Sequence, residues 1–343
     1  MGVAAGFRTV GRSGLVVSEV GVGASTFGRH GLASKTQESV NAIVDAALDV
    51  GVTLFDVADV YGRSAFNGAQ LSPEEDTGYP GLSEEMLGVA LRGRRDDVII
   101  ATKFGIPLGG ANGRDHGVLG SRRYIKRAVE SSLRRLRTEW IDLYQIHQPD
   151  PVTPVEETLA ALDQLIREGK VRYIGNSNFA GWQIAQAEHV AKEIGANRFV
   201  SAQNEYSLLV RDAELEVLPA ARHYGLGFLP YFPLKDGLLT GKYRPDSAPA
   251  DAKVTRLKPH LLESAPWERL AALAEFAAER QLTPATVAFG WLLAQPPVSS
   301  VIAGVTRPQQ IRQNAAATKW TPTEEDLAEL GTIFAAKPVD PLA

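Results

Sequence analysis

The chain has 343 residues, 44% of them hydrophobic, with a formal net charge of −4 and no cysteine. An acidic balance argues against general nucleic-acid binding, and the lack of cysteine excludes disulfides, thiolate catalysis and cysteine-ligated metal. No apolar run approaches the roughly 18 residues of a membrane span, and no signal peptide is visible. We therefore expect a cytoplasmic protein without a nucleic-acid or membrane partner. Composition leaves open whether it is a monomer or a homo-oligomer.

Short apolar runs alternate with helical patterns along the whole chain. The first helix is expected at residues 36–50, and another from Ser83, where a capping Ser precedes early acids and a terminal Gly. The eight runs read as strands are VSEVGVGAS, TLFD, DVIIATK, IDLYQIH, VRYIGNSN, FVSAQNEY, GFLPYFPL and VSSVIAGV. Repeated β-then-α units imply parallel strands with crossover helices. Eight of them predict an α/β fold, a closed (β/α)8 TIM barrel forming a single domain over residues 1–343.

Further elements extend this barrel. Residues 7–17, FRTVGRSGLVV, place a GRSG turn between two β-prone runs and predict an N-terminal β-hairpin that could plug the barrel bottom. TPATVAFGWLLAQ predicts an extra C-terminal helix before the last strand. Long loops at residues 63–82, 105–121 and 235–265 follow strands. They should therefore lie on the face where barrel enzymes carry their chemistry.

Polar side chains close several of the predicted strands. Asp56 and Tyr61 follow TLFD, Lys103 ends IIATK, and His147 ends LYQIH. Singly, each has an ordinary interpretation: a strand-ending aspartate, a packing tyrosine, a solvated lysine or a structural histidine.

Together, these four groups suit proton donation to a developing alkoxide. A lysine ammonium stabilises a phenolate and lowers the tyrosine pKa, and a paired aspartate keeps the lysine charged. A histidine could orient a carbonyl or relay the proton. No serine or cysteine nucleophile accompanies them, so acyl transfer is not expected, and reduction would require a hydride source.

Several motifs in the chain are similar to those of the aldo-keto reductase family. In order, they are FDVADVYG, SEEMLG, ATKFG, SLRRLRTEWIDLYQIHQPDP, REGKVRYIGNSNF, QNEYSLL, YFPLKDGLLTGKY and VIAGVTRPQQIRQN. The resemblance implies a barrel that binds NADPH in extended form, and the chain has no strand–GxGxxG–helix unit. It also implies reduction of an aldehyde or ketone with Tyr61 as general acid. Lys103 would lower the Tyr61 pKa, Asp56 would pair with Lys103, and His147 would position the carbonyl oxygen.

The same resemblance implies a cofactor site. Ser177 and Asn178 would hold the nicotinamide carboxamide, with Gln203 beside them, and Tyr231 would stack on the ring. The other implied contacts are Gly23 and Ala24 at the first strand, Phe232, Leu234, Gly237 and Lys242 near the pyrophosphate, and Gly304, Thr306, Arg307, Gln310, Gln313 and Asn314 at the adenosine end.

The chain departs from the family pattern at three places. Gln310 stands where an arginine often meets the 2′-phosphate of NADPH, which leaves Arg307 as the main cation and NADH as an alternative. Phe232 replaces a usual serine. Residues 63–82 separate YG from SEEMLG, and this insertion either flanks the pocket and shapes substrate choice or is a solvated surface loop.

The physiological substrate and two other functions stay open. The resemblance to bacterial members of the family implies a small aldehyde, ketone or sugar as substrate, including nucleotide-linked hexoses of natural-product pathways. Near the mouth, Arg114, Arg122, Arg123 and Lys235 would either meet a phosphorylated substrate or be solvated. The chain could instead be a cofactor-binding regulatory subunit, like the potassium-channel β subunits of the same family. A Schiff-base aldolase using Lys103 is the third interpretation, and the adjacent Asp56 argues against it.

Overall fold

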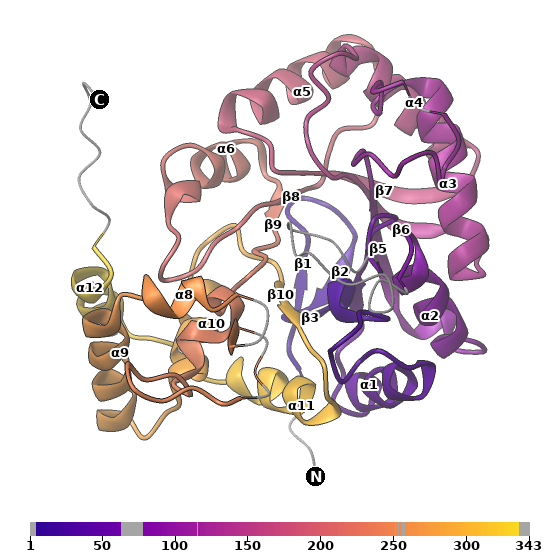
Figure 1. Cartoon of the computed structure of the whole chain (residues 1–343). Coiled ribbons are helices and arrows are strands. Elements are labelled where there is room, and N and C mark those ends of the chain that lie inside the picture. Colours follow the sequence, from indigo (N-terminus) through magenta and orange to yellow (C-terminus); the bar gives the residue numbers. More distant parts are fainter. Residues whose placement is uncertain are drawn as a thin grey trace.

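The computed structural model describes residues 5–62, 78–114, 116–250, 252, 254–255 and 258–335. Eight parallel strands form its centre, in the order β10-β3-β4-β5-β6-β7-β8-β9 (Figure 1). Their bounds are β3 Val20–Gly23, β4 Leu54–Asp56, β5 Ile99–Phe104, β6 Ile141–Ile146, β7 Val171–Ser177, β8 Ser201–Gln203, β9 Gly227–Phe228 and β10 Val301–Gly304. Each follows the previous one beside it in the sheet, as the eight sequential βα units predict.

The two outer strands of this order, β9 and β10, meet and close the sheet. The amide of Phe228 donates to the carbonyl of Pro297 at 2.6 Å, and the amide of Ile302 donates to the carbonyl of Pro230 at 2.9 Å. Proline has no N–H, so Pro230 offers β10 no donor, and the pairing here consists of isolated parallel bridges. The predicted (β/α)8 barrel is confirmed, although Tyr231 lies three residues beyond the end of β9 rather than at it.

Helices surround the strands (Figure 1). Their bounds are α1 Gln37–Asp49, α2 Leu82–Ala90, α3 Arg122–Leu136, α4 Val155–Arg167, α5 Gly181–Glu193, α6 Val217–Tyr224, α8 His260–Glu263, α9 Trp267–Glu279, α10 Pro284–Leu293, α11 Pro308–Ala317 and α12 Glu324–Ile333. Helix α10 is the extra helix expected before the last strand, and α12 adds another after α11. No described helix is long and apolar enough to cross a membrane.

The start of α2 differs from the sequence prediction. Gly81, at φ 91°, precedes the helix as its N-cap, a conformation that glycine adopts readily. The Ser83 hydroxyl instead donates to the carbonyl of Ala24 at 2.6 Å. Ser83 therefore does not cap the helix; it ties α2 to the end of β3.

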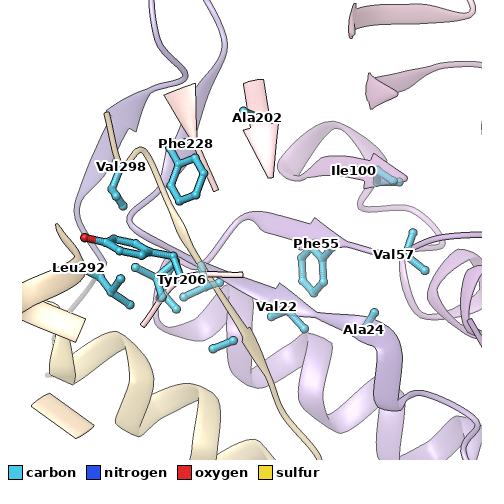
Figure 2. Close-up of a cluster of buried hydrophobic side chains, with 14 of the residues drawn as sticks. Val22, Ala24, Phe55, Val57, Ile100, Ala202, Tyr206, Phe228, Leu292 and Val298 are labelled. Atoms are coloured by element: carbon cyan, nitrogen blue, oxygen red, sulfur yellow. The ribbon is translucent and has the colours of Figure 1, made fainter. Parts of the chain in front are cut away.

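Two apolar layers stabilise the barrel. The larger one fills the space between strands and helices, and Figure 2 shows part of it, with Phe55, Val57, Tyr206 and Leu292 among its buried members. Such burial contributes roughly 25 cal/mol per Å² of apolar surface.

The smaller layer lies inside the barrel. An antiparallel hairpin, β1 Phe7–Thr9 and β2 Val16–Ser18, brings Val10, Leu15 and Val17 against Leu54, Ala101, Leu143, Leu229 and Ile302 of the barrel strands and their ends. The hairpin thus closes the amino-terminal end of the barrel, as expected. Polar groups inside the barrel must face the other end.

Candidate active site

Strand alternation separates an apolar layer from a polar one inside the barrel. Leu54 and Ala101 belong to the apolar interior layer, and Asp56 and Lys103 follow two residues later on the same strands. Because side chains alternate faces along a strand, residues two apart point to the same side, about 6.6 Å further along. The side chains that point into the barrel therefore change from apolar to charged over two residues toward the carboxyl ends of the strands.

Lys103 lies at the centre of the polar layer. Its Nζ donates to Asp56 Oδ1 at 2.6 Å and to the carbonyl of Val57 at 3.1 Å, and its side chain is fully buried. Burial lowers the pKa of Lys103, but the Asp56 carboxylate and the hydrogen bonds to Asp56 and Tyr61 outweigh that effect, so its pKa is raised. The ammonium group is therefore charged at neutral pH.

Tyr61 lies beside this ion pair. Lys103 Nζ is 5.2 Å from the centroid of the Tyr61 ring, and the two side chains are hydrogen-bonded. Burial raises the pKa of Tyr61 above its ordinary value, and the charge of Lys103 lowers it by less. The lysine charge thus acts on the Tyr61 pKa in the expected direction, but desolvation of the phenolate outweighs it.

His147 contacts Tyr61 edge-on, with ring centroids 5.8 Å apart and planes at 87°. Burial, and then the charge of Lys103, lower the pKa of His147 well below 6.5, so the imidazole is neutral. Its Nδ1 is buried and makes no hydrogen bond within the part of the chain that the structure describes. A neutral imidazole can still donate one N–H to an oxygen in the barrel mouth.

The other oxygen of Asp56 is held by amide side chains. Gln203 Nε2 donates to Asp56 Oδ2 at 2.8 Å, and Gln145 Nε2 approaches the same atom at 3.5 Å. On β7, a Cβ at Gly175 would lie 2.1 Å from Ser201 Oγ and 3.2 Å from the Gln145 side chain. The missing side chain of Gly175 thus makes room mainly for the Ser201 hydroxyl, which donates to Gln145 Oε1 at 3.4 Å. Gln203 supports Asp56 directly, rather than lying only beside the nicotinamide residues as expected.

The residues expected to hold a carboxamide lie together at the ends of β7 and β9. Asn178, at φ 60°, donates from Nδ2 to the carbonyl of His147 at 2.9 Å and to Ser177 Oγ at 3.2 Å. The Tyr231 hydroxyl donates to Asn178 Oδ1 at 2.8 Å, and Ser177 Oγ donates to the carbonyl of Gln203. An aromatic ring and several amide and hydroxyl groups therefore border the four residues described above.

The segment after β9 has a strained backbone. Phe232, Lys235, Asp236 and Gly237 all have positive φ angles, which is uncommon for side chains as large as phenylalanine. Such strain persists where the surroundings enforce it and is frequent at ligand sites.

Ion pairs hold this segment in place. Lys235 pairs with Glu205 at 2.5 Å, and Lys258 pairs with Asp236 at 2.7 Å. The glycine at position 237 leaves space near an ammonium group, since a Cβ there would lie 3.4 Å from Lys242 Nζ. The half-buried Leu234 directly precedes the 3-10 turn Lys235–Thr240. Lys235 and Lys258 are engaged in these ion pairs, and Lys242 beside Gly237 is the lysine of this segment that best suits phosphate oxygens.

The residues expected at the adenosine end lie at β10 and α11. Gln310 Oε1 accepts from the amides of Thr306 at 2.7 Å and Arg307 at 3.1 Å, so it caps α11. Gly304 is exposed, with nothing within 4 Å of where a Cβ would be. Gln313 is exposed, whereas Asn314 is buried.

Gly23 and Ala24 lie on the other side of β10. A Cβ at Gly23 would meet the backbone of Ala303 at 3.2 Å, so the glycine permits close strand packing, and Ala24 is fully buried.

The residues present suit a nicotinamide dinucleotide: an aromatic face with amides at one end, Lys242 near Gly237, and the open Gly304 with Arg307 at the other. The described residues contain no cluster of three or more groups able to hold a metal ion. Two surface hollows, of about 570 Å³ beside α3 and 440 Å³ under the hairpin, contain none of the predicted site residues. The insertion at 63–82 falls largely outside the described residues.

Sequence reasoning missed several residues next to this site. Gln145 was detectable, because it lies two positions before His147 and so shares its face. Asp59, Glu84, Asn112 and Arg135 form a buried polar group behind the site that no local pattern indicates. Lys235 was expected at the mouth as a possible phosphate partner, but its ammonium is paired with Glu205.

A barrel with a buried lysine–aspartate pair, a tyrosine and a neutral histidine at its carboxyl end defines a class of oxidoreductase, and comparison with known proteins agrees. The model of the Aldo/keto reductase family matches residues 19–334. The chain therefore belongs to the aldo/keto reductase family, whose members carry out NAD(P)H-dependent carbonyl reduction.

Individual relatives match over nearly their full length. An uncharacterized oxidoreductase, YrpG, of Bacillus subtilis is 36% identical over 96% of this chain and 95% of its own. A probable voltage-gated potassium channel subunit beta of Oryza sativa is 33% identical, covering 97% of each. A probable aldo-keto reductase 1 of Glycine max is 33% identical over 97% of this chain and 89% of its own.

Proposed function

We propose that the chain reduces an aldehyde or ketone to an alcohol with NADPH, and that Tyr61 is the general acid. The observation that carries this proposal is the fully buried Lys103 Nζ, 2.6 Å from Asp56 Oδ1 and hydrogen-bonded to Tyr61. A bound nicotinamide coenzyme would supply the hydride. The chain's own residues then have to deliver one proton to the carbonyl oxygen.

The protonation states support this assignment. The ordinary tyrosine pKa is about 10, and burial raises that of Tyr61, so Tyr61 carries its proton at neutral pH before reaction. When the proton leaves Tyr61 Oη, the charge of Lys103 stabilises the phenolate that remains. Neutral His147 can donate an N–H to the same carbonyl oxygen and so orient it.

The coenzyme assignment rests on the cations along the proposed site. Lys242 near Gly237 and Arg307 at the start of α11 would meet phosphate groups, and the Tyr231 ring offers a face for the nicotinamide. NADH is the alternative coenzyme, because Gln310 supplies no cation and its oxygen is occupied in capping α11.

A binding and turnover experiment tests the proposal. The protein is titrated with NADPH and with NADH by fluorescence, and coenzyme absorbance is then followed with an activated aromatic aldehyde. Tight NADPH binding with turnover is expected. Absence of binding by either coenzyme would contradict the proposal at its centre.

Relatives named as probable potassium channel β subunits favour one second candidate, a regulatory subunit that binds coenzyme. Such a protein would bind NADPH without turnover across a panel of aldehydes and sugars. The aldolase interpretation is disfavoured because the raised pKa of Lys103 keeps the amine protonated. Borohydride trapping of a carbonyl substrate on Lys103 would support it instead.

We propose that the insertion at residues 63–82 shapes substrate choice by flanking the pocket. A sugar or another natural-product intermediate is the proposed physiological substrate. Limited proteolysis with and without coenzyme tests the placement: protection of residues 63–82 by ligand is expected. Equal cleavage would indicate a surface loop.

A further inference from the structure

A second buried polar group lies behind the proposed active site, on the outer face of the strands. Its members are Asp59, Glu84 and Thr102, all fully buried, together with Asn112 and Arg135. They come from the turn after β4, from α2, β5 and α3, and from the loop between β5 and α3. Proton transfer at Tyr61, as proposed above, uses none of them.

One half of this group connects the Tyr61 turn to α3. Asn112 Nδ2 donates to Asp59 Oδ2 at 2.8 Å. Arg135 Nη1 donates to Asn112 Oδ1 at 3.3 Å. The amide of Asn112 thus bridges a carboxyl group two residues before Tyr61 and a guanidinium on the helix outside.

The other half returns from α3 to the strand that carries Lys103. Arg135 Nε donates to Glu84 Oε2 at 2.6 Å, and Thr102 Oγ1 donates to Glu84 Oε1 at 2.6 Å. The backbone amide of Asp59 donates to the carbonyl of Lys103 at 3.1 Å. These bonds close a ring that starts and ends at Asp59 and passes through two consecutive residues of β5.

The ring therefore fixes the turn of Tyr61 relative to Lys103. Asp59 lies between Asp56 and Tyr61 in sequence, and Thr102 precedes Lys103 directly. Both the side chain and the backbone of Asp59 are hydrogen-bonded, so these contacts oppose movement of the turn relative to β5. A shift of about 1 Å at a proton donor can cost about 100-fold in rate.

The charge of the group is consistent with this role. Glu84 and Arg135 form an ion pair, so Asp59 is an additional carboxyl group in a buried site. Burial, followed by the charge of Glu84, raises the pKa of Asp59 well above its usual range, and its Oδ1 makes no hydrogen bond within the described residues. An ionised Asp59 would raise the pKa of Tyr61 further, so the neutral form suits the donor.

We propose that Asp59 is a positioning residue for Tyr61, and that it acts as the link of a closed hydrogen-bond ring through Thr102 and Lys103. The proposal rests on the proposed role of Tyr61 as general acid. It assigns Asp59 no contact with substrate or coenzyme.

Three variants test it: Asp59→Ala, Asp59→Asn and Asn112→Ala. The two alanine variants should lower kcat by about 10- to 100-fold, with little change in KM or in the Kd of NADPH, because the donor is displaced while the binding surfaces remain. Asp59→Asn should stay within about threefold of wild type, since its side-chain oxygen can still accept from Asn112 Nδ2 and its backbone amide still donates to Lys103. Asn112→Ala keeps the test open if Asp59→Ala does not fold.

Asp163→Ala is the matched control. Asp163 is a buried carboxylate on α4 that accepts from the backbone amide and side chain of Asn197, away from the site. This control should lose stability and keep the kcat of the folded enzyme. Wild-type kcat in both Asp59→Ala and Asn112→Ala would overturn the positioning role. An Asp59→Asn variant as slow as Asp59→Ala would also overturn it.

A readout without turnover separates this inference from the proposed function. The Tyr61 ring resonance, assigned by its loss in Tyr61→Phe, is followed by NMR with ring-labelled tyrosine. It should shift in Asp59→Ala and Asn112→Ala and stay near wild type in Asp59→Asn and Asp163→Ala. A wild-type enzyme that turns over no carbonyl would defeat the proposed function, whereas an unmoved resonance in both ring variants would defeat the positioning role.

Discussion

Lys103 and Asp56 form an ion pair 2.6 Å long inside the barrel, with side-chain exposures of 0% and 4%. Removing one partner of such a pair leaves an uncompensated buried charge, which typically costs about 3–5 kcal/mol of stability. Lys103→Met should therefore destabilise the protein by that order, as well as abolish turnover. Urea unfolding measures the first effect and NADPH oxidation the second.

The double variant Lys103→Met with Asp56→Asn separates the two effects. The amide that replaces the Asp56 carboxylate keeps an acceptor for Gln203 but carries no charge, so most of the lost stability should return. Activity should not return, because the cation beside Tyr61 is still missing. A double variant as unstable as Lys103→Met alone would show that unpaired charge is not the cause.

Tyr61→Phe removes one hydroxyl and leaves the ring that contacts His147. Loss of a general acid typically lowers the rate by about 10²–10⁴-fold, so kcat should fall within that range. The Kd of NADPH should change little, since the phenol is assigned no coenzyme contact. Stopped-flow absorbance and fluorescence titration give both values, and a variant with wild-type kcat would remove Tyr61 from the mechanism.

His147 should make the free energy of unfolding depend on pH in the acidic range. The folded protein holds the His147 pKa well below 6.5, so between that lowered value and 6.5 the unfolded chain binds a proton that the folded one does not. Stability therefore falls as pH drops below about 6.5, by up to about 1.4 kcal/mol per pH unit for one such group.

His147→Gln removes this titration and should lose less stability than wild type between pH 7.5 and pH 5. Urea unfolding at both pH values gives the difference, and His260→Gln, at an exposed position, is the matched control. Equal losses in wild type and His147→Gln would contradict a neutral buried imidazole.

Much of this architecture follows from local sequence signals. Alternating apolar runs and helical patterns predict eight βα units, and the hairpin signal in residues 7–17 corresponds to β1 and β2. Because parallel strands end at one edge, the strand-end residues Asp56, Lys103 and His147 were expected together, and the structure brings them together.

The remaining features depend on contacts between distant segments. No residue near Asn112 in the sequence indicates that its amide donates to Asp59. This contact depends on the path that the loop between β5 and α3 takes in the folded protein. Ser83 has the local signature of a cap, yet the close approach of β3 takes its hydroxyl to Ala24. That a nearby lysine lowers the pKa of Tyr61 can be predicted from residue types alone. The larger increase in that pKa caused by burial can be known only from the folded structure.

Asp59 should make stability fall with rising pH. Its pKa is raised in the folded protein, so above about pH 4 the unfolded chain releases a proton that the folded one retains, which favours unfolding progressively up to the folded pKa. The charged or titratable groups facing it are Lys103 on β5, Glu84 on α2, Arg135 on α3, Tyr144 on β6 and Tyr61 on its own turn.

Asp59→Asn cannot ionise, so its stability relative to wild type should increase with pH by up to about 1.4 kcal/mol per unit. Thermal unfolding from pH 5 to pH 8 measures this trend, with Asp163→Asn as the control for a buried carboxylate whose pKa is lowered. A constant difference between Asp59→Asn and wild type would mean that Asp59 is ionised throughout.

Coenzyme preference should depend on Arg307 and Gln310. A hydrogen bond to a charged group contributes about 1.5–3 kcal/mol, so Arg307→Ala should weaken NADPH binding by about 10- to 100-fold and leave NADH binding nearly unchanged. Arg312→Ala, an exposed arginine on the same helix that pairs with Asp49, is the control.

Gln310→Arg should act in the opposite direction. It adds a cation at the start of α11, where helix amides and the helix dipole already favour anions. It also removes the cap on the amides of Thr306 and Arg307, which typically costs about 0.5–2 kcal/mol of stability. Fluorescence titration should therefore show a larger NADPH-to-NADH affinity ratio in a slightly less stable protein. Unchanged ratios in both Arg307→Ala and Gln310→Arg would place the 2′-phosphate away from α11.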